Sequence, residues 1–156
     1  MTAIETTALA WGIKKSFLGY LENLPDCMFA ENDGASRDPD TGLFQFPFQR
    51  RVELDEGGYR LEFSGDIRIK AHGGMLLVIL MNPWLEINER GIELSVVDLM
   101  HWPDTSNREV IGHSPITVAP ENLRSQEIPL ILAESAVETF NNVYQPGEPL
   151  DPVVLI

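Results

Sequence analysis

A strand pattern runs through the stretch Tyr59-Arg60-Leu61-Glu62-Phe63-Ser64-Gly65-Asp66-Ile67-Arg68-Ile69-Lys70-Ala71. The odd-numbered positions are apolar or small and the even-numbered ones are polar or charged, which is the period-two alternation of a strand with one buried face. Gly65 interrupts the apolar series, so we expect either one long strand that bends there or two consecutive strands.

Further extended segments follow on the C-terminal side of this stretch. Gly73-Gly74 is a favoured two-residue hairpin turn because both glycines can adopt positive φ, and the apolar run 75–81 then returns antiparallel. Short strands are also expected over 85–87, 92–96, 116–118 and 128–132, with loops over 31–42 and 103–107.

Two segments near the chain ends have helical spacing instead. The first carries apolar residues at positions 11, 17, 18, 21 and 24 and ends at Pro25, and the second carries them at 132, 136, 137, 140 and 144 and ends at Pro146-Gly147. Two short helices beside six or more antiparallel strands favour a mainly β fold over an α/β fold. We therefore predict an antiparallel β-sandwich, or a partly open barrel, with two short α-helices near the N- and C-terminal ends.

The size and charge of the chain exclude several classes of protein. Its 156 residues suit a single domain, 1–156, that is large enough to bury a core. With 11 basic and 24 acidic side chains the formal charge is −13, which is the wrong sign for a protein that binds nucleic acid through phosphate contacts. The single cysteine, Cys27, forms no intramolecular disulfide and supplies no cysteine-rich zinc site.

Neither a membrane span nor a secretory signal is recognisable in the sequence. The longest apolar run, 75–81, has seven residues, whereas a bilayer-spanning helix needs roughly 20. The first residues contain neither a basic region nor an apolar core of the kind found in signal peptides. The location therefore stays open between a cytoplasmic protein, as the sequence is written, and an exported or cell-surface protein whose signal has been removed.

Familiar catalytic motifs are absent from the sequence. It has no G-x-S-x-G elbow, no P-loop and no H-E-x-x-H zinc motif. Gly112-His113-Ser114 lacks the glycine that would complete an elbow, and His101 with Asp104 would supply only two ligands of a metal site. We therefore expect a protein that is not an enzyme.

Three motifs, spread over nearly the whole chain, carry more information when they are taken together. They are Trp11-Gly12-Ile13-Lys14-Lys15-Ser16-Phe17-Leu18-Gly19-Tyr20, Ala71-His72-Gly73-Gly74-Met75-Leu76, and Phe140-Asn141-Asn142-Val143-Tyr144 continued by Leu150-Asp151-Pro152-Val153. In this order they resemble an HtaA-type haem-binding domain, the module of haem-uptake proteins on the surface of certain Gram-positive bacteria. Two positions differ from the family pattern, because Ala71 stands where glycine is usual and Val143 where an aromatic residue would cover the porphyrin.

The resemblance implies a β-sandwich with short helices and a role for several residues. Tyr20 matches the tyrosine that ligates ferric haem iron, and His72 matches the histidine that hydrogen-bonds the phenol of this ligand. Ser16 and Tyr144 match positions near the haem propionates, and the segment 140–144, which begins with Phe140, closes the pocket. The cofactor implied is ferric haem b.

The chemistry of these residue types agrees with the implied roles. Ser16 and Tyr20 are four positions apart on the predicted helix, so their side chains are neighbours about 6 Å apart. Tyrosinate is a hard anionic ligand that suits Fe³⁺. A hydrogen bond from a partner such as His72 to the phenolic oxygen helps the phenol to lose its proton.

Cationic groups are expected around this site although the chain as a whole is acidic. Arg68, Lys70 and His72 share one face of their strand at two-residue steps, and Lys14-Lys15 lie directly before the serine of the first motif. Our hypothesis is that this cluster, with Lys70 as a cofactor contact, offsets the −13 charge of the chain where the anionic propionates bind.

Several functions remain open from the sequence alone. The favoured one is capture, transfer or buffering of ferric haem in iron acquisition, with haem and a haem donor or acceptor protein as partners and no nucleic acid. The alternatives are an interaction or adhesion module that keeps the fold without haem and, less favoured, a haem-dependent enzyme, because tyrosinate also ligates haem in catalases. Taken singly, Tyr20, His72 and Tyr144 are ordinary surface or packing residues, and only the joint motif favours haem binding.

Overall fold

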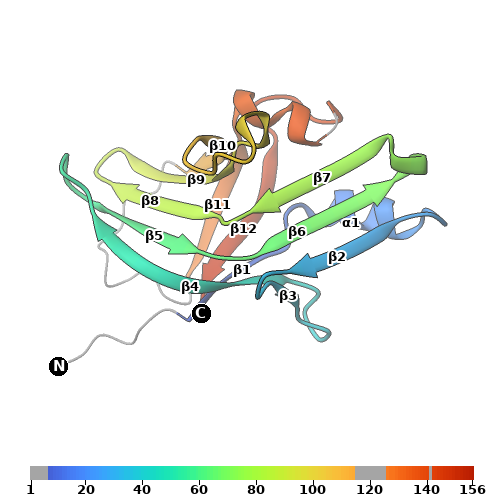
Figure 1. Ribbon diagram of the computed structural model, residues 1–156, viewed down its shortest axis with the longest axis horizontal. Helices are drawn as coiled ribbons and strands as arrows, with labels where there is room; N and C mark the ends of the chain where they lie inside the picture. The colour runs from blue at the N-terminus through green and yellow to red at the C-terminus, as the bar shows by residue number, and fades with distance from the viewer. Residues whose placement is uncertain (1–6, 115–125, 141) are drawn as a thin grey trace.

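The computed structural model of the chain describes residues 7–114, 126–140 and 142–156 (Figure 1). Strands dominate it, so the mainly β prediction is confirmed. The strands are β1 (Ala8–Trp11), β2 (Met28–Asn32), β3 (Ser36–Arg37), β4 (Phe44–Glu53), β5 (Tyr59–Phe63), β6 (Asp66–Ala71), β7 (Leu76–Met81), β8 (Trp84–Asn88), β9 (Gly91–Val97), β10 (Arg108–Ser114), β11 (Glu127–Leu132) and β12 (Pro149–Leu155). The strand predicted over 116–118 lies outside the described residues.

A closed antiparallel barrel forms the larger part of the fold. In the described part of the chain its strands follow the order β1-β12-β11-β10-β9-β8-β5-β4, and β1 pairs with β4 to close the circle, with Leu9 opposite Phe46. The short β3 is attached to β4 at Ser36 and Arg37. Of the two predicted architectures the barrel is therefore present, and it is closed rather than partly open.

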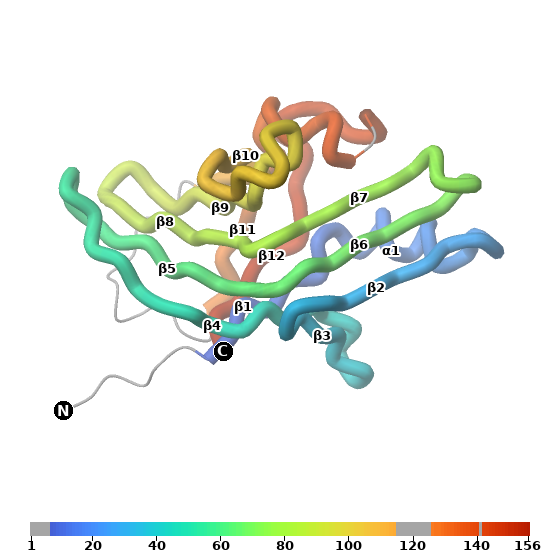
Figure 2. The backbone as a smooth tube through the Cα atoms, in the orientation of Figure 1, coloured from blue at the N-terminus to red at the C-terminus, as the bar shows by residue number. Residues whose placement is uncertain are grey.

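A second, three-stranded sheet in the order β2-β6-β7 extends from the barrel (Figures 1 and 2). It arises because β5 continues into β6 and β7 continues into β8. Residues 64–65 interrupt the first pair of strands and residues 82–83 the second, and the two interruptions face each other. At this break the backbone N–H of Gly65 donates to Oδ1 of Asn82 at 3.1 Å, and the N–H of Asn82 donates to the Gly65 carbonyl at 2.8 Å. The stretch 59–71 is thus two strands, one of the two predicted alternatives.

The period-two pattern of this stretch sets which side chains enter the core. Its large apolar odd-numbered residues are all buried: Tyr59, Leu61, Phe63, Ile67 and Ile69. Two even-numbered acids are buried as well, because arginines neutralise them. Glu62 accepts from Arg50 at 2.9 Å and from Arg60 at 2.8 Å, and Asp66 accepts from Arg68 at 3.0 Å.

The helical elements are shorter than the spacing of apolar residues predicts. Among the described residues they are α1 (Lys15–Glu22) and the 3₁₀ turns η1 (His72–Gly74), η2 (Leu99–His101), η4 (Glu134–Ala136) and η5 (Glu138–Phe140). Trp11 belongs to β1 and not to the first helix, because Gly12 and Ile13, the latter with φ of 63°, turn the chain between strand and helix. At the C-terminal end, Leu132 still belongs to β11, and the segment before β12 forms two 3₁₀ turns instead of an α-helix.

No helix among the described residues has the length and apolar character that a bilayer crossing requires.

Candidate functional site

Helix α1 presents Tyr20 on its outer side. Phe17, Leu18 and Leu21 form the apolar stripe of the helix and are buried, whereas Tyr20 is 52% exposed and Ser16, one turn earlier, is also exposed. Spacing of three and four residues puts the buried side chains on one face of a helix, and that leaves Ser16 and Tyr20 together on another. The predicted pair of neighbours is therefore present on the solvent side of α1.

The N-terminus of α1 is bound to β12 through Asp151. Oδ1 of Asp151 accepts from the backbone N–H of Lys15 at 3.1 Å, the main-chain N–H of Asp151 donates to the carbonyl of Ile13 at 2.9 Å, and the indole of Trp11 donates to the carbonyl of Asp151 at 2.8 Å. A carboxylate at the first turn satisfies an N–H that has no partner within the helix and complements the helix dipole. The first and third sequence motifs are thereby joined, which fixes where Tyr20 lies.

The β6–β7 hairpin brings His72 to Tyr20. The hydroxyl oxygen of Tyr20 lies 3.0 Å from Nε2 of His72, and the two ring centroids are 6.1 Å apart. Figure 1 shows α1 beside the part of the hairpin that points away from the barrel. The contact that the resemblance implies between these residues is thus present in the structure.

The hairpin tip differs from the two-residue turn that the sequence predicts. Ala71 pairs with Leu76, so four residues form the connection, and the N–H of Met75 closes it by donating to the carbonyl of His72 at 3.1 Å. Three consecutive residues have positive φ: 54° at His72, 65° at Gly73 and 93° at Gly74. Glycine adopts this left-handed region readily, whereas it is unfavourable for His72, so contacts to the tip must hold it.

Asp26, in the connection between α1 and β2, is such a contact. Its Oδ2 accepts from the backbone N–H of Gly73 at 2.7 Å. The hydrogen bond from Gly73, followed by smaller contributions from the backbone N–H of His72, lowers the pKa of the Asp26 carboxyl. Sequence reasoning missed Asp26, because a carboxylate that binds a backbone N–H in a distant loop leaves no periodic signal.

The segment 140–144 packs against the same helix. Phe140 is fully buried with its ring centroid 5.8 Å from that of Phe17 in an edge-to-face arrangement, and the ring of Tyr144 contacts Phe17 at the same distance. Val143 between them is 55% exposed. Phe140 is therefore a core residue, Tyr144 is half-buried against the core, and Val143 is exposed.

The predicted cationic cluster is only partly available for a ligand. Lys14 donates to the carbonyl of Pro149 at 2.7 Å, lies 3.4 Å from a carboxylate oxygen of Glu148 and stands 5.1 Å from the ring centroid of Tyr144. Arg68 forms an ion pair with the buried Asp66, as described above. Within the described residues, the exposed ammonium groups of Lys15 and Lys70 have no ion-pair partner. The side chain of Lys70 reaches the hairpin tip, since a Cβ on Gly74 would lie 3.3 Å from Cε of Lys70.

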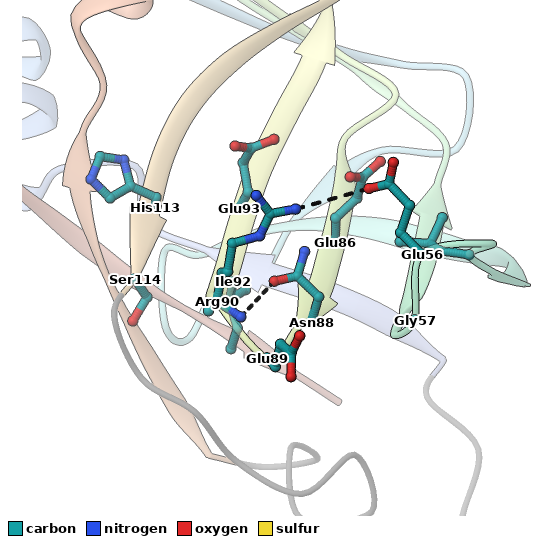
Figure 3. A pocket seen from close by; sticks show the side chains of 12 residues that line it. Glu56, Gly57, Glu86, Asn88, Glu89, Arg90, Ile92, Glu93, His113 and Ser114 are labelled. Carbon is teal, nitrogen blue, oxygen red and sulfur yellow. Dashed lines mark hydrogen bonds and ion pairs between the residues drawn. The ribbon is translucent and has the colours of Figure 1, made fainter.

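A cavity of about 530 Å³ lies elsewhere, where the β4–β5 and β8–β9 hairpins end (Figure 3). Glu56, Glu86, Glu89 and Glu93 line it together with Arg90 and His113. Partial burial and the neighbouring Glu86 raise the pKa of Glu93. None of the predicted site residues lines this cavity, and its excess of carboxylates disfavours an anionic ligand. Tyr20 and its surroundings are therefore the better candidate for the predicted ligand.

The described residues contain no cluster of three or more histidine, cysteine, aspartate or glutamate side chains that could hold a bare metal ion. Tyr20 and His72 offer one phenolic oxygen and one imidazole in contact with each other. Such a pair suits a metal whose other ligands come with it, as in a metalloporphyrin.

The chain matches a known protein family over most of its length. A model of the protein family described as Htaa matches residues 6–156. No curated protein matches the chain.

Several solved structures are similar to the chain. The C-terminal domain of HtaA from Corynebacterium glutamicum has a TM-score of 0.74 and 24% identity, over 96% of this chain and 94% of that one. The N-terminal domain of HtaA from the same organism has a TM-score of 0.75 and 18% identity, over 98% and 96%. The heme binding protein HtaB from that organism has a TM-score of 0.67 and 14% identity, over 96% and 91%. At these identities the similarity shows a common fold.

Proposed function

The chain belongs to the HtaA family, and on that premise we propose that it binds ferric haem b through the phenolate of Tyr20 and functions in the capture and transfer of haem. The observation that carries this proposal is the 3.0 Å hydrogen bond between Tyr20 and His72. A similar protein, HtaB of Corynebacterium glutamicum, is described as a heme binding protein.

The hydrogen bond prepares Tyr20 to act as an anionic ligand. A phenol is neutral at pH 7, so it must lose its proton before it can bind as phenolate. With the proton on Nε2, the imidazole of His72 donates to the phenolic oxygen and stabilises its negative charge. The same bond orients the oxygen, as partners of metal ligands commonly do.

The surroundings of Tyr20 fit a porphyrin. The phenolic oxygen is accessible, since the residue is 52% exposed, and its bond to His72 leaves lone-pair capacity for a metal. Met75 on the hairpin tip is 85% exposed, and Val143 on the segment that packs against α1 is exposed as well. Apolar side chains exposed on two segments that neighbour α1 are consistent with a surface that binds an apolar ligand.

Ferric iron supplies a Lewis acid that favours the phenolate over the phenol. Haem b fits the cysteine content, because covalent attachment through a C-x-x-C-H motif needs two cysteines and the chain has only Cys27. The ammonium groups of Lys15 and Lys70 support binding of the propionates, since each is exposed and has no ion-pair partner within the described residues.

Capture and transfer suit this site better than catalysis. Tyr20, the proposed iron ligand, is exposed at the surface, where a partner protein can remove or deliver the haem. The expected transfer is measurable with apomyoglobin as acceptor: the haem-loaded protein should lose its haem to apomyoglobin completely and at a rate that does not depend on added peroxide. Consumption of peroxide by the loaded protein at a rate well above that of free hemin would favour an enzyme instead.

A titration of the purified protein with hemin tests the binding proposal. The Soret absorbance should saturate at one hemin per chain, with the charge-transfer bands of a ferric high-spin haem. Tyr59→Phe is a matched control, because Tyr59 lies on β5 in the barrel, far from α1, and it should give the same titration (Figure 1). The proposal is wrong if the unmodified protein shows no saturable change.

A further inference from the structure

We propose that Asp26 is a positioning residue for His72: its carboxylate holds the tip of the β6–β7 hairpin in the left-handed conformation that directs the imidazole toward Tyr20. The positioning of His72 by Asp26 is a property of the protein without haem. Its consequence for haem affinity rests on the function proposed above.

The backbone of the hairpin tip forms a site for a carboxylate. His72, Gly73 and Gly74 have consecutive positive φ values, and successive N–H groups in turns of this kind can converge on an anion. The N–H of Gly73 points to Oδ2 of Asp26 at 2.7 Å, and the N–H of His72 also lowers the pKa of this carboxyl. A hydrogen bond from an N–H to an ionised carboxylate is stronger than one between neutral groups.

The same carboxylate connects the two members of the site. Asp26 follows α1, which carries Tyr20, and the chain between them is held by bonds from the N–H of Leu24 to the carbonyl of Leu21 at 3.0 Å and from the N–H of Cys27 to the carbonyl of Leu24 at 3.4 Å. The bond from Asp26 to Gly73 therefore ties the end of this helix to the tip that carries His72. Without it, the unfavourable φ of 54° at His72 loses a contact that opposes its relaxation.

The first test uses the protein without haem. In nuclear Overhauser spectra, the ring protons of His72 and Tyr20 should show cross-peaks that are lost or strongly weakened in Asp26→Ala. Asp104→Ala is the matched control, because Asp104 is also an exposed carboxylate that binds a backbone N–H in a loop, that of Ser106 at 2.9 Å. Full retention of the cross-peaks in Asp26→Ala would overturn the proposal.

The second test uses a double-mutant cycle on haem dissociation, with apomyoglobin as acceptor. Asp26→Ala should accelerate dissociation by about 10-fold, the lower end of what the loss of a ligand's hydrogen-bond partner costs, and Asp26→Asn should have a smaller effect. In the His72→Ala background Asp26→Ala should have almost no effect, because Asp26 acts through His72. An equal acceleration in both backgrounds would contradict the positioning role.

The outcomes separate this inference from the proposed function. If the unmodified protein fails to bind hemin, the proposed function fails while the cross-peaks still decide the role of Asp26. If the protein binds hemin and Asp26→Ala changes neither the cross-peaks nor dissociation, the positioning role alone is wrong. If circular dichroism shows that Asp26→Ala is unfolded, Asp26→Asn takes its place in both tests, with weakened cross-peaks expected and unchanged cross-peaks contradicting the role.

Discussion

The hydroxyl of Tyr20 and the imidazole of His72 are hydrogen-bonded at 3.0 Å although they are 52 positions apart in the sequence. Each residue has its own anchor. Asp151 fixes the start of the helix that carries Tyr20, and Asp26 fixes the hairpin tip that carries His72. The contact therefore depends on four segments of the chain, namely α1, the β6–β7 hairpin tip, β12 and the α1–β2 connection, and it is exposed at the surface.

Loss of the imidazole should weaken haem binding without unfolding the protein. His72→Ala removes the donor that stabilises the phenolate, so we expect the dissociation constant for hemin to rise by about 10- to 100-fold. His72→Gln keeps an N–H donor, so its dissociation constant for hemin should lie between those of the unmodified protein and His72→Ala. His101→Ala is the control, because His101 is exposed on another loop beside Asp98. An affinity equal to that of the unmodified protein in His72→Ala would contradict the assigned role.

Lys15 and Lys70, which have no ion-pair partner among the residues that the structure describes, should contribute through their charge. Lys15→Glu and Lys70→Glu should each lower the affinity for hemin by about threefold at low ionic strength, in the range measured for exposed ion pairs. The difference should shrink in high salt because mobile ions screen exposed charges. Arg90→Glu provides a matched charge reversal at the distant cavity. Equal losses in all three variants would mean that only net charge matters.

Asp151 should stabilise the fold through the N-terminus of α1. Asp151→Ala removes the acceptor for the N–H of Lys15, which should lower the free energy of unfolding by about 1 kcal/mol. For a chain of this length that loss corresponds to a decrease in Tm of roughly 2–4 °C. Asp151→Asn keeps a side-chain oxygen and should lose less. Thermal unfolding followed by circular dichroism provides the measurement, and an unchanged Tm in Asp151→Ala would contradict this stabilising role of Asp151.

The stability of the protein should depend on pH through Glu109. Burial raises the pKa of this carboxyl, with Asp98 and Glu138 adding to the effect and a 2.7 Å hydrogen bond from Thr139 opposing it. The folded state therefore binds the proton more tightly than the unfolded state, so stability falls as pH rises from the unfolded pKa through the folded one. Glu109→Gln should be more stable than the unmodified protein at pH 7, and this advantage should vanish at pH 4. Urea unfolding at both pH values tests it, and an advantage of equal size at both would contradict it.

Much of the fold follows from local patterns in the sequence. The alternation over 59–71 correctly predicts which apolar side chains enter the core, and Gly65 marks the break between β5 and β6. Closure of the barrel depends on pairing of β1 with β4, which brings together residues far apart in the sequence and leaves no periodic signal. Trp11 matched a helical spacing by chance, because apolar residues of a strand and of the following helix can fall into register.

The candidate site was predictable in part. The resemblance to the HtaA family indicated Tyr20 and His72, which the structure brings into contact, and their role toward haem stays a prediction. The sequence could not show that Lys14 already has an ion-pair partner, because that partner, Glu148, lies on a distant segment. Asp26 was missed for a similar reason, because it binds a main-chain N–H, and any residue except proline presents one.

The resonance Raman spectrum of the protein loaded with ferric hemin tests the central claim most directly, because modes of an iron-bound phenolate are distinct from those of the porphyrin. The chain has three tyrosines, so single substitutions identify the ligand. We predict phenolate modes in the unmodified protein and in Tyr59→Phe, and their loss in Tyr20→Phe. A loaded protein without phenolate modes, or modes that persist in Tyr20→Phe, would contradict Tyr20 as the iron ligand.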